Sequence, residues 1–344
     1  MTKKEVKQNR RKKRLFLAIL MILFTGSLLG TSTFAWFTAN KTVTVDAIDV
    51  NVAAANGLQI SVDGINWKPA ISNKDILEAY KTYSSSVNQI PASSSSPVST
   101  VGAIDSNTGY MNMYAGAIET TTDGSAYILT AEKSTEANNV GDDGAVTSGG
   151  TAGNFVAFDL FFMTTSATPI YLTNQSSVLY KSGPKGIQNA ARVALVTQGT
   201  IAAGSSASSI QALKAQAATK PFIWEPNFDV HTASAVANAS SVYGVQTKET
   251  GAEKITYSGV KAAIPKTAAV ALNSADSNYF GDVKINLATP STGIDATFDK
   301  VFDLNAGITK VRIYMWIEGQ DVDCENDASG GSVTFNLQFS MNEQ

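Results

Sequence analysis

The chain contains many short segments in which every second residue is apolar. The clearest are KVRIYMWI, which begins at Lys310, and SVTFNLQF, which begins at Ser332. Such alternation places one set of side chains on a buried face of a β-strand. In these two segments the set is Val311, Ile313, Met315 and Ile317, then Val333, Phe335, Leu337 and Phe339. Many short strands joined by loops predict an all-β fold, an antiparallel jelly-roll-like β-sandwich.

Other segments extend this prediction. Further strand candidates are IYLT, ARVALV, FIW and DVKINLA, and the nearly continuous apolar run NFVAFDLFFM at 154–163 is typical of a central strand covered on both faces. LQISVDGINW predicts a β-hairpin with a two-residue turn at Asp63-Gly64. Only residues 73–82, with Asn73 as cap, and 206–218 indicate helices. The sandwich should therefore carry minor helices and long loop and helical insertions.

The first 35 residues have the layout of a secretory signal peptide. A basic stretch ending in RRKKR precedes the apolar run LFLAILMILF, and the small-residue segment TGSLLGTSTFA follows. Signal peptidases require small residues at the first and third positions before the cut, which Ala35 and Thr33 supply. We therefore expect cleavage before Trp36 and a secreted chain. The alternative is a retained anchor, because the apolar stretch over 15–37 is just long enough to span a bilayer.

The charge distribution argues against nucleic acid as a partner. Of 26 Lys and Arg and 29 Asp and Glu, eight basic residues and one acid, Glu5, lie in the first 35 positions. The remainder has 18 basic and 28 acidic residues, a net charge of −10. Such a surface repels phosphate backbones and anionic headgroups. We expect membrane contact only for the uncleaved precursor.

The residues around the expected cleavage site carry a family resemblance. GTSTFAWFT, followed by a β-rich run, resembles the signal peptides cut by SipW-type signal peptidases of Gram-positive bacteria. The chain is accordingly similar to the TasA/camelysin family of biofilm-matrix proteins, and WIEGQDVDCENDASGG near the C-terminus carries the same resemblance. The resemblance implies a jelly-roll sandwich, self-assembly into a homopolymeric fibre, and a SipW-type peptidase as a processing partner.

Directly after the expected cleavage site, TVTVDAIDVNV at 42–52 is a strongly alternating strand. Its apolar residues change phase near Ala47, which predicts a bulge or bend. The candidate assembly residues on it are Val43, Val45, Ile48, Val50 and Val52. The family resemblance implies donation of this strand to a neighbouring subunit, whereas folding back onto its own domain is the alternative.

We divide the chain into three parts: a signal peptide at 1–35, an N-terminal strand at 36–52 as candidate donor strand, and a single elaborated β-sandwich domain at 53–344.

An acid-rich turn, EGQDVDCENDASGG, is the candidate metal site. Alternating acids on a loop suit Ca²⁺, although the glycine and final glutamate of an EF-hand are missing. The candidate ligands are Asp321, Asp323, Glu325 and Asp327. The alternative, which we favour, is a solvated acidic turn between the last two strands. Within it, Cys324 is interpreted as a small buried residue.

The sequence lacks the motifs of common catalytic sites. His231 is the single histidine and no nucleophile-elbow motif accompanies it, so we interpret it as a surface or capping residue. Camelysin is described as a metalloprotease, but HExxH is absent here and one histidine with one cysteine cannot build a common zinc site. We therefore predict a secreted, non-enzymatic fibre subunit without a required cofactor. A monomeric adhesin or glycan-binding module is the alternative, and a secreted hydrolase is a third hypothesis.

Overall fold

The computed structural model describes residues 45–55, 58–94, 96–120, 127–136, 138–238, 257–268, 277–287, 300–324 and 329–341. These ranges consist mainly of strands with a few short helices, which confirms the predicted all-β class. Within them, none of the helices has the length and apolar character needed to cross a bilayer.

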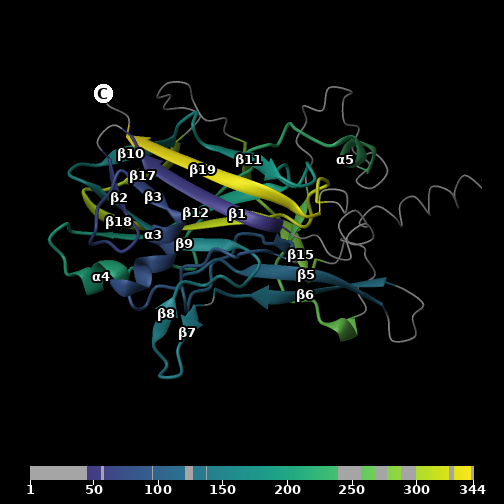
Figure 1. Cartoon of the computed structure of the whole chain (residues 1–344), viewed down its shortest axis with the longest axis horizontal. Coiled ribbons are helices and arrows are strands. Elements are labelled where there is room, and N and C mark those ends of the chain that lie inside the picture. The colour runs from purple at the N-terminus through teal and green to yellow at the C-terminus, as the bar shows by residue number, and fades with distance from the viewer. Residues whose placement is uncertain are drawn as a thin grey trace, which may run out of the picture.

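The first large sheet brings together the two ends of the described chain. Its central strands, β1 and β19, lie side by side across one face of the molecule (Figure 1). In order, the sheet contains β17 (Lys300–Leu304), β10 (Thr168–Leu172), β19 (Gly331–Met341), β1 (Val45–Ala54) and β3 (Ala70–Ser72), and β11 (Ser177–Ser182) also pairs with β19.

The second large sheet is built around β18, which pairs on one side with β12 and on the other with β9. All eleven residues of β18 are buried. In order, the sheet contains β16 (Ile285–Asn286), β13 (Phe222–Trp224), β12 (Ala191–Ile201), β18 (Gly307–Ile317), β9 (Val156–Thr164) and β2 (Gln59–Ser61).

The two sheets share one apolar core, so the β-sandwich prediction is confirmed. The alternating residues expected to point inward on the last two strands all belong to this core, together with Ile48, Val50 and Val52 of β1. Two strand pairs are parallel rather than antiparallel, β1 with β19 and β13 with β16. Neither pair is joined by a hairpin turn, so no turn forces its strands into opposite directions.

The outer face of the second sheet lies beneath a further layer, which we call the cover (residues 83–94, 96–120 and 127–136). It contains β4 (Val98–Ser99), β5 (Met113–Thr120) and β6 (Tyr127–Ser134), and its Val98, Ile104 and Met111 pack with Phe155, Ala157, Tyr314 and Trp316. This second core explains why β9 is apolar along most of its length, as predicted from 154–163. Smaller strand pairs are β7 (Asn139–Val140) with β8 (Val146–Ser148) and β14 (Ser258–Val260) with β15 (Phe280–Asp282).

The helices are shorter than the sequence suggested. α3 (Asn73–Glu78) and the 3₁₀ turn η1 (Ala79–Lys81) confirm the first, but Ser72 rather than Asn73 is its cap. α4 (Ala207–Gln211) covers only part of 206–218, because the N–H of Ala215 donates to Gln198 Oε1 at 3.0 Å instead of continuing the helix. The sequence did not predict α5 (Ala233–Asn238) or the 3₁₀ turn η3 (Lys266–Ala268).

The predicted Asp63-Gly64 turn is a longer reversal than expected. Strand β2 ends at Ser61, and the chain returns to pair at Lys68. Asp63 Oδ1 accepts the backbone N–H groups of Ile65 and Asn66, both at 2.8 Å, and so holds an open loop rather than a two-residue turn. Burial alone would raise the pKa of Asp63, but hydrogen bonds, the largest from Thr82, lower that pKa to about 2.

Candidate functional site

Strand β1, the candidate assembly strand, is folded into its own sandwich over its described length. The backbone of Val45 pairs opposite Gly331, whereas Ile48 pairs opposite Val333, so β1 uses one residue more than β19 between these pairs. This confirms the bulge predicted near Ala47. The side chains of Ile48, Val50 and Val52 are 7%, 1% and 1% exposed, and burial in the core fixes the register of this half of the strand.

The other edge of β1 is only partly covered. β3 pairs with three residues that begin at Asn51. Just upstream, Val50 N donates to Asn73 Oδ1 at 2.8 Å, and Asn73 Nδ2 donates to Ile48 O at 3.4 Å. The side-chain amide of Asn73 thus makes two hydrogen bonds of the kind that a neighbouring strand would make. In the described ranges no strand pairs with this edge before Asn51. The N-terminal half of β1 therefore has a strand partner on one side only.

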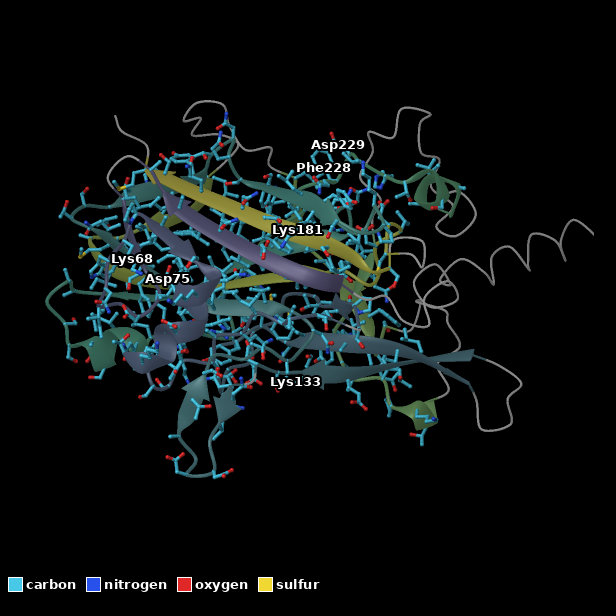
Figure 2. The ribbon with its side chains drawn as sticks, viewed as in Figure 1. Lys68, Asp75, Lys133, Lys181, Phe228 and Asp229 are labelled. Carbon is cyan, nitrogen blue, oxygen red and sulfur yellow. The ribbon has the colours of Figure 1, made fainter. Side chains whose placement is uncertain are left out.

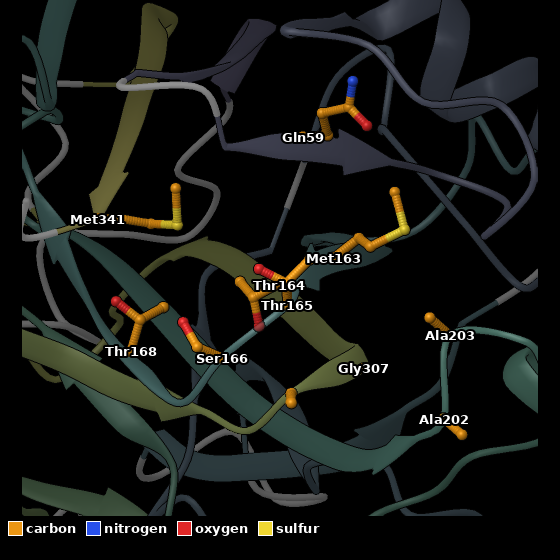
Figure 3. Close-up of a pocket in the computed structure, with 11 residues that line it drawn as sticks. Gln59, Met163, Thr164, Thr165, Ser166, Thr168, Ala202, Ala203, Gly307 and Met341 are labelled. Carbon is orange, nitrogen blue, oxygen red and sulfur yellow. The ribbon is translucent and has the colours of Figure 1, made fainter.

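A cavity of about 750 Å³ opens at the far end of the sandwich (Figure 3). It lies where β9 ends and β18 begins, beside Met341 at the end of β19. Because β1 and β19 run parallel, this cavity and the start of β1 lie at opposite ends of the first sheet. None of the described residues that line it is charged, and they include Met163, Met341, Ala202, Ala203, Gly307, Thr164 and Ser166.

The described first part of the acid-rich turn, up to Cys324, is buried, contrary to the solvated turn that we favoured. Asp321 and Asp323 are 6% and 1% exposed in their side chains. Asp321 forms an ion pair with Arg192, and Arg192 also binds Glu225 at 2.8 Å. A protein cation thus occupies the carboxylate expected to hold Ca²⁺. The other two candidate ligands, Glu325 and Asp327, lie outside the described residues, and no group of metal-ligating side chains is found within the described ones.

His231 belongs to the same cluster and is not a surface residue. Its side chain is 3% exposed, and its Nδ1 lies 2.6 Å from Asp323 Oδ2. The other oxygen of Asp323 accepts the N–H of Thr232 at 2.8 Å. These contacts tie the loop before α5 to the turn between β18 and β19. Cys324, in the same turn, is fully buried, as the sequence predicted.

Glu318, at the start of the turn, has an altered protonation equilibrium. Burial raises its pKa to about 7, although hydrogen bonds from Ser99, from Trp316 Nε1 at 3.0 Å and from Gln320 N at 3.1 Å partly oppose the shift. The pKa of Asp321 is also raised, first by burial and then by the neighbouring Asp323, against the attraction of Arg192. Both carboxyl groups therefore bind a proton more readily in the folded chain than in the unfolded one.

A second buried cluster joins the second sheet to the cover. Asp159 of β9 binds Arg312 at 2.9 Å and Lys310 at 3.2 Å, and accepts a hydrogen bond from Tyr83 at 2.9 Å. Arg312 also pairs with Glu136 of the cover at 3.3 Å. Burial would raise the pKa of Asp159, but the two cations lower it below its usual value. Burial lowers the pKa of Lys310, while Asp159 opposes that shift.

Sequence reasoning missed this cluster. KVRIYMWI looks like a strand with one solvent face, so Lys310 and Arg312 were not recognised as buried. The available signal was Asp159, a single acid within the apolar run 154–163, because a charge inside a buried strand requires a counter-charge. The signal-cleavage residues Thr33, Ala35 and Trp36, and the assembly residue Val43, lie outside the described part of the chain.

Comparison with known proteins leaves the chain without an assigned family. It matches no family model and no curated protein sequence.

Proposed function

We propose that the chain is a secreted, non-enzymatic structural subunit of an extracellular or cell-surface fibre, and that subunits assemble by strand exchange. The observation that carries the proposal is the half-covered edge of β1, which lies immediately after the alternating segment 42–45. Because the N-terminal half of β1 has a strand partner on one side only, few main-chain hydrogen bonds oppose the departure of the segment that precedes it. In this proposal residues 36–45 leave their own subunit, while residues 48–54 stay.

The cavity at the far end of the sandwich, whose described lining is uncharged, is the candidate acceptor. An exchanged strand combines main-chain hydrogen bonds with pockets for alternate side chains. The methionines and alanines that line the cavity suit Trp36, Phe37 and Val43 of a neighbour better than a charged ligand. Because the donor leaves at one end and the acceptor lies at the other, the contact is head-to-tail, and such contacts generate filaments when they do not close into rings.

Export and processing complete the proposal. Residues 1–35 act as the signal peptide, a SipW-type signal peptidase cuts before Trp36, and the mature chain forms a homopolymer in the extracellular matrix or at the cell surface. Membrane contact is limited to the uncleaved precursor. Mass spectrometry of the secreted protein tests the cut directly, because an intact N-terminal segment would contradict it.

Deletion of residues 36–45 from the mature protein tests the assembly step. Electron microscopy should show fibres of the chain that begins at Trp36 and only discrete particles of the deleted chain, with unchanged circular dichroism. In a matched variant, residues 36–45 are replaced by a Gly/Ser sequence of equal length. This chain should also stay monomeric, because it keeps the length of the segment but not its alternation of apolar side chains. Fibres in either variant would refute strand exchange.

A further inference from the structure

The outer face of the first sheet carries a groove that is separate from the end cavity and from the donor segment 36–45. Its floor is made by outward-facing positions of β1 and β19, and its volume is about 620 Å³. One wall is β3 with the start of α3, and the other is the turn between β10 and β11, with Asn174 and Gln175. The small side chains of Ala53 and Ala70, which also line it, leave the space between the walls.

Side-chain amides and hydroxyls dominate the floor and hold one another in place. Asn51 Nδ2 donates to Asn336 Oδ1 at 3.0 Å, and Asn336 Nδ2 donates to Ser177 Oγ at 3.5 Å, which links three adjacent strands. Thr173 Oγ1 donates to Gln338 Oε1 at 2.5 Å. These bonds orient the amides so that Asn51 Oδ1 remains as an acceptor and Gln338 Nε2 as a donor, with no partner among the described residues.

Two ion pairs lie in or beside the groove. Asp75 in the wall binds Lys68 and accepts a hydrogen bond from Ser72 at 2.8 Å. Asp49 and Lys181, further along the sheet, form a second ion pair. Figure 2 labels Lys68, Asp75 and Lys181. Balanced charge offers no excess field to a phosphate or a sulfated polymer. The chemistry of the groove therefore favours a neutral ligand rich in both donors and acceptors.

The groove also offers apolar surface. Leu179 is 52% exposed and lines it, two residues along β11 from Ser177. It provides carbon surface in a groove lined by amides, a combination that suits the C–H face and hydroxyl rim of a sugar ring. The groove is open to solvent rather than enclosed, so it admits a chain and not only a single ring.

We propose that this groove binds a neutral polysaccharide. Asn51 Oδ1 accepts from a sugar hydroxyl, Gln338 Nε2 donates to a sugar oxygen, and Leu179 covers the C–H face of a ring. The binding site faces outward from the sandwich, away from the end cavity assigned to strand exchange. A fibre built from such subunits would present one groove per subunit to the surrounding matrix, and binding does not depend on assembly.

Isothermal titration of the mature protein with neutral hexasaccharides tests the proposal. The probes are cellohexaose, laminarihexaose and chitohexaose, with a heparin hexasaccharide as the charged comparison. At least one neutral probe should bind, and the heparin probe should not. Absence of heat with all three neutral probes, or tighter binding of the heparin probe, would overturn the assignment.

Variants then locate the site. Gln338→Ala and Asn51→Ala should each lower the affinity for the neutral probe at least tenfold. Gln216 is an exposed glutamine outside the groove, and Gln216→Ala should leave this affinity unchanged. Should a floor variant fail to fold, Gln175→Ala on the exposed wall provides the same comparison with an expected severalfold loss. Equal affinities across groove and control variants would refute the groove as the site. Loss of fibres without any change in sugar affinity would instead make this face a contact between subunits.

Discussion

The two large sheets bury their inner faces alike but treat their outer faces differently. On the first sheet, β19 alternates between buried and partly exposed residues, and its outward side chains are Thr334, Asn336 and Gln338. On the second, β18 is buried on both faces because the cover lies over it. Lys310 and Arg312 occupy positions that would face water on an open sheet. Alternation of apolar residues in a strand therefore identifies one buried face of the sheet. Whether the other face is exposed or buried depends on which other segments of the chain pack against it.

As a consequence, an ion pair contributes differently to stability on the outer faces of the two sheets. Asp159 and Arg312 are fully buried, and each needs the other to offset the loss of hydration. Asp49 and Lys181 form a pair of the same type on the first sheet, but their side chains are 42% and 43% exposed. An exposed pair contributes little, because water already solvates both partners. The next predictions use this contrast.

The largest expected effect is that of Asp159→Ala. The substitution leaves Lys310 buried without its counter-charge and Arg312 with Glu136 alone, and should lower the free energy of unfolding by about 3–5 kcal/mol. Urea denaturation of the mature monomer measures the change. Asp49→Ala is the matched control on the open sheet, with an expected loss of about 0–1 kcal/mol. Equal losses in the two variants would break the comparison between the faces.

A smaller effect is expected from the pH dependence of Glu318. Because its folded pKa of about 7 lies above the unfolded value, its contribution to stability is complete below the unfolded pKa and is lost as the pH rises through about 7. Stability should fall by about 1–3 kcal/mol between pH 5 and pH 8, and Glu318→Gln should flatten that slope. Thermal unfolding across this range measures it. An unchanged slope in Glu318→Gln, equal to that of the exposed Glu132→Gln control, would contradict the assignment.

The smallest effect concerns the edge of β1. Asn73→Ala removes the hydrogen bond to Val50 N and the one to Ile48 O, and should cost about 1 kcal/mol in unfolding free energy. It should also speed hydrogen exchange at Val50 N relative to Val52 N, which lies where β3 covers the strand. Exchange that is equally slow at both amides in the variant would show that another group covers this edge. Asn174→Ala, at an exposed turn, is the control for stability.

Local patterns in the sequence predicted the inner face of the fold well. The alternating residues of β18 and β19, the apolar run of β9 and the bulge near Ala47 all depend on neighbours in the chain, so period and phase reveal them. The cover could not be predicted in this way, because its contact with β18 joins residues such as Glu136 and Arg312 that are far apart in sequence. The same reason explains the misassigned turn: burial of Asp321 and Asp323 depends on Arg192 and His231, which come from other elements.

Cysteine cross-linking between subunits tests the central claim of head-to-tail strand exchange most directly. One batch of mature protein carries Phe37→Cys and the other Met341→Cys, and the two are mixed under oxidising conditions. Within one chain the first sheet separates the start of β1 from Met341 by roughly 33 Å along β19, whereas the eight residues after Phe37 reach about 29 Å at most. The account predicts disulfide-linked dimers in the mixture of the two batches. It predicts no such dimers when the Phe37→Cys protein is oxidised by itself. Absence of mixed dimers while fibres still form would contradict it.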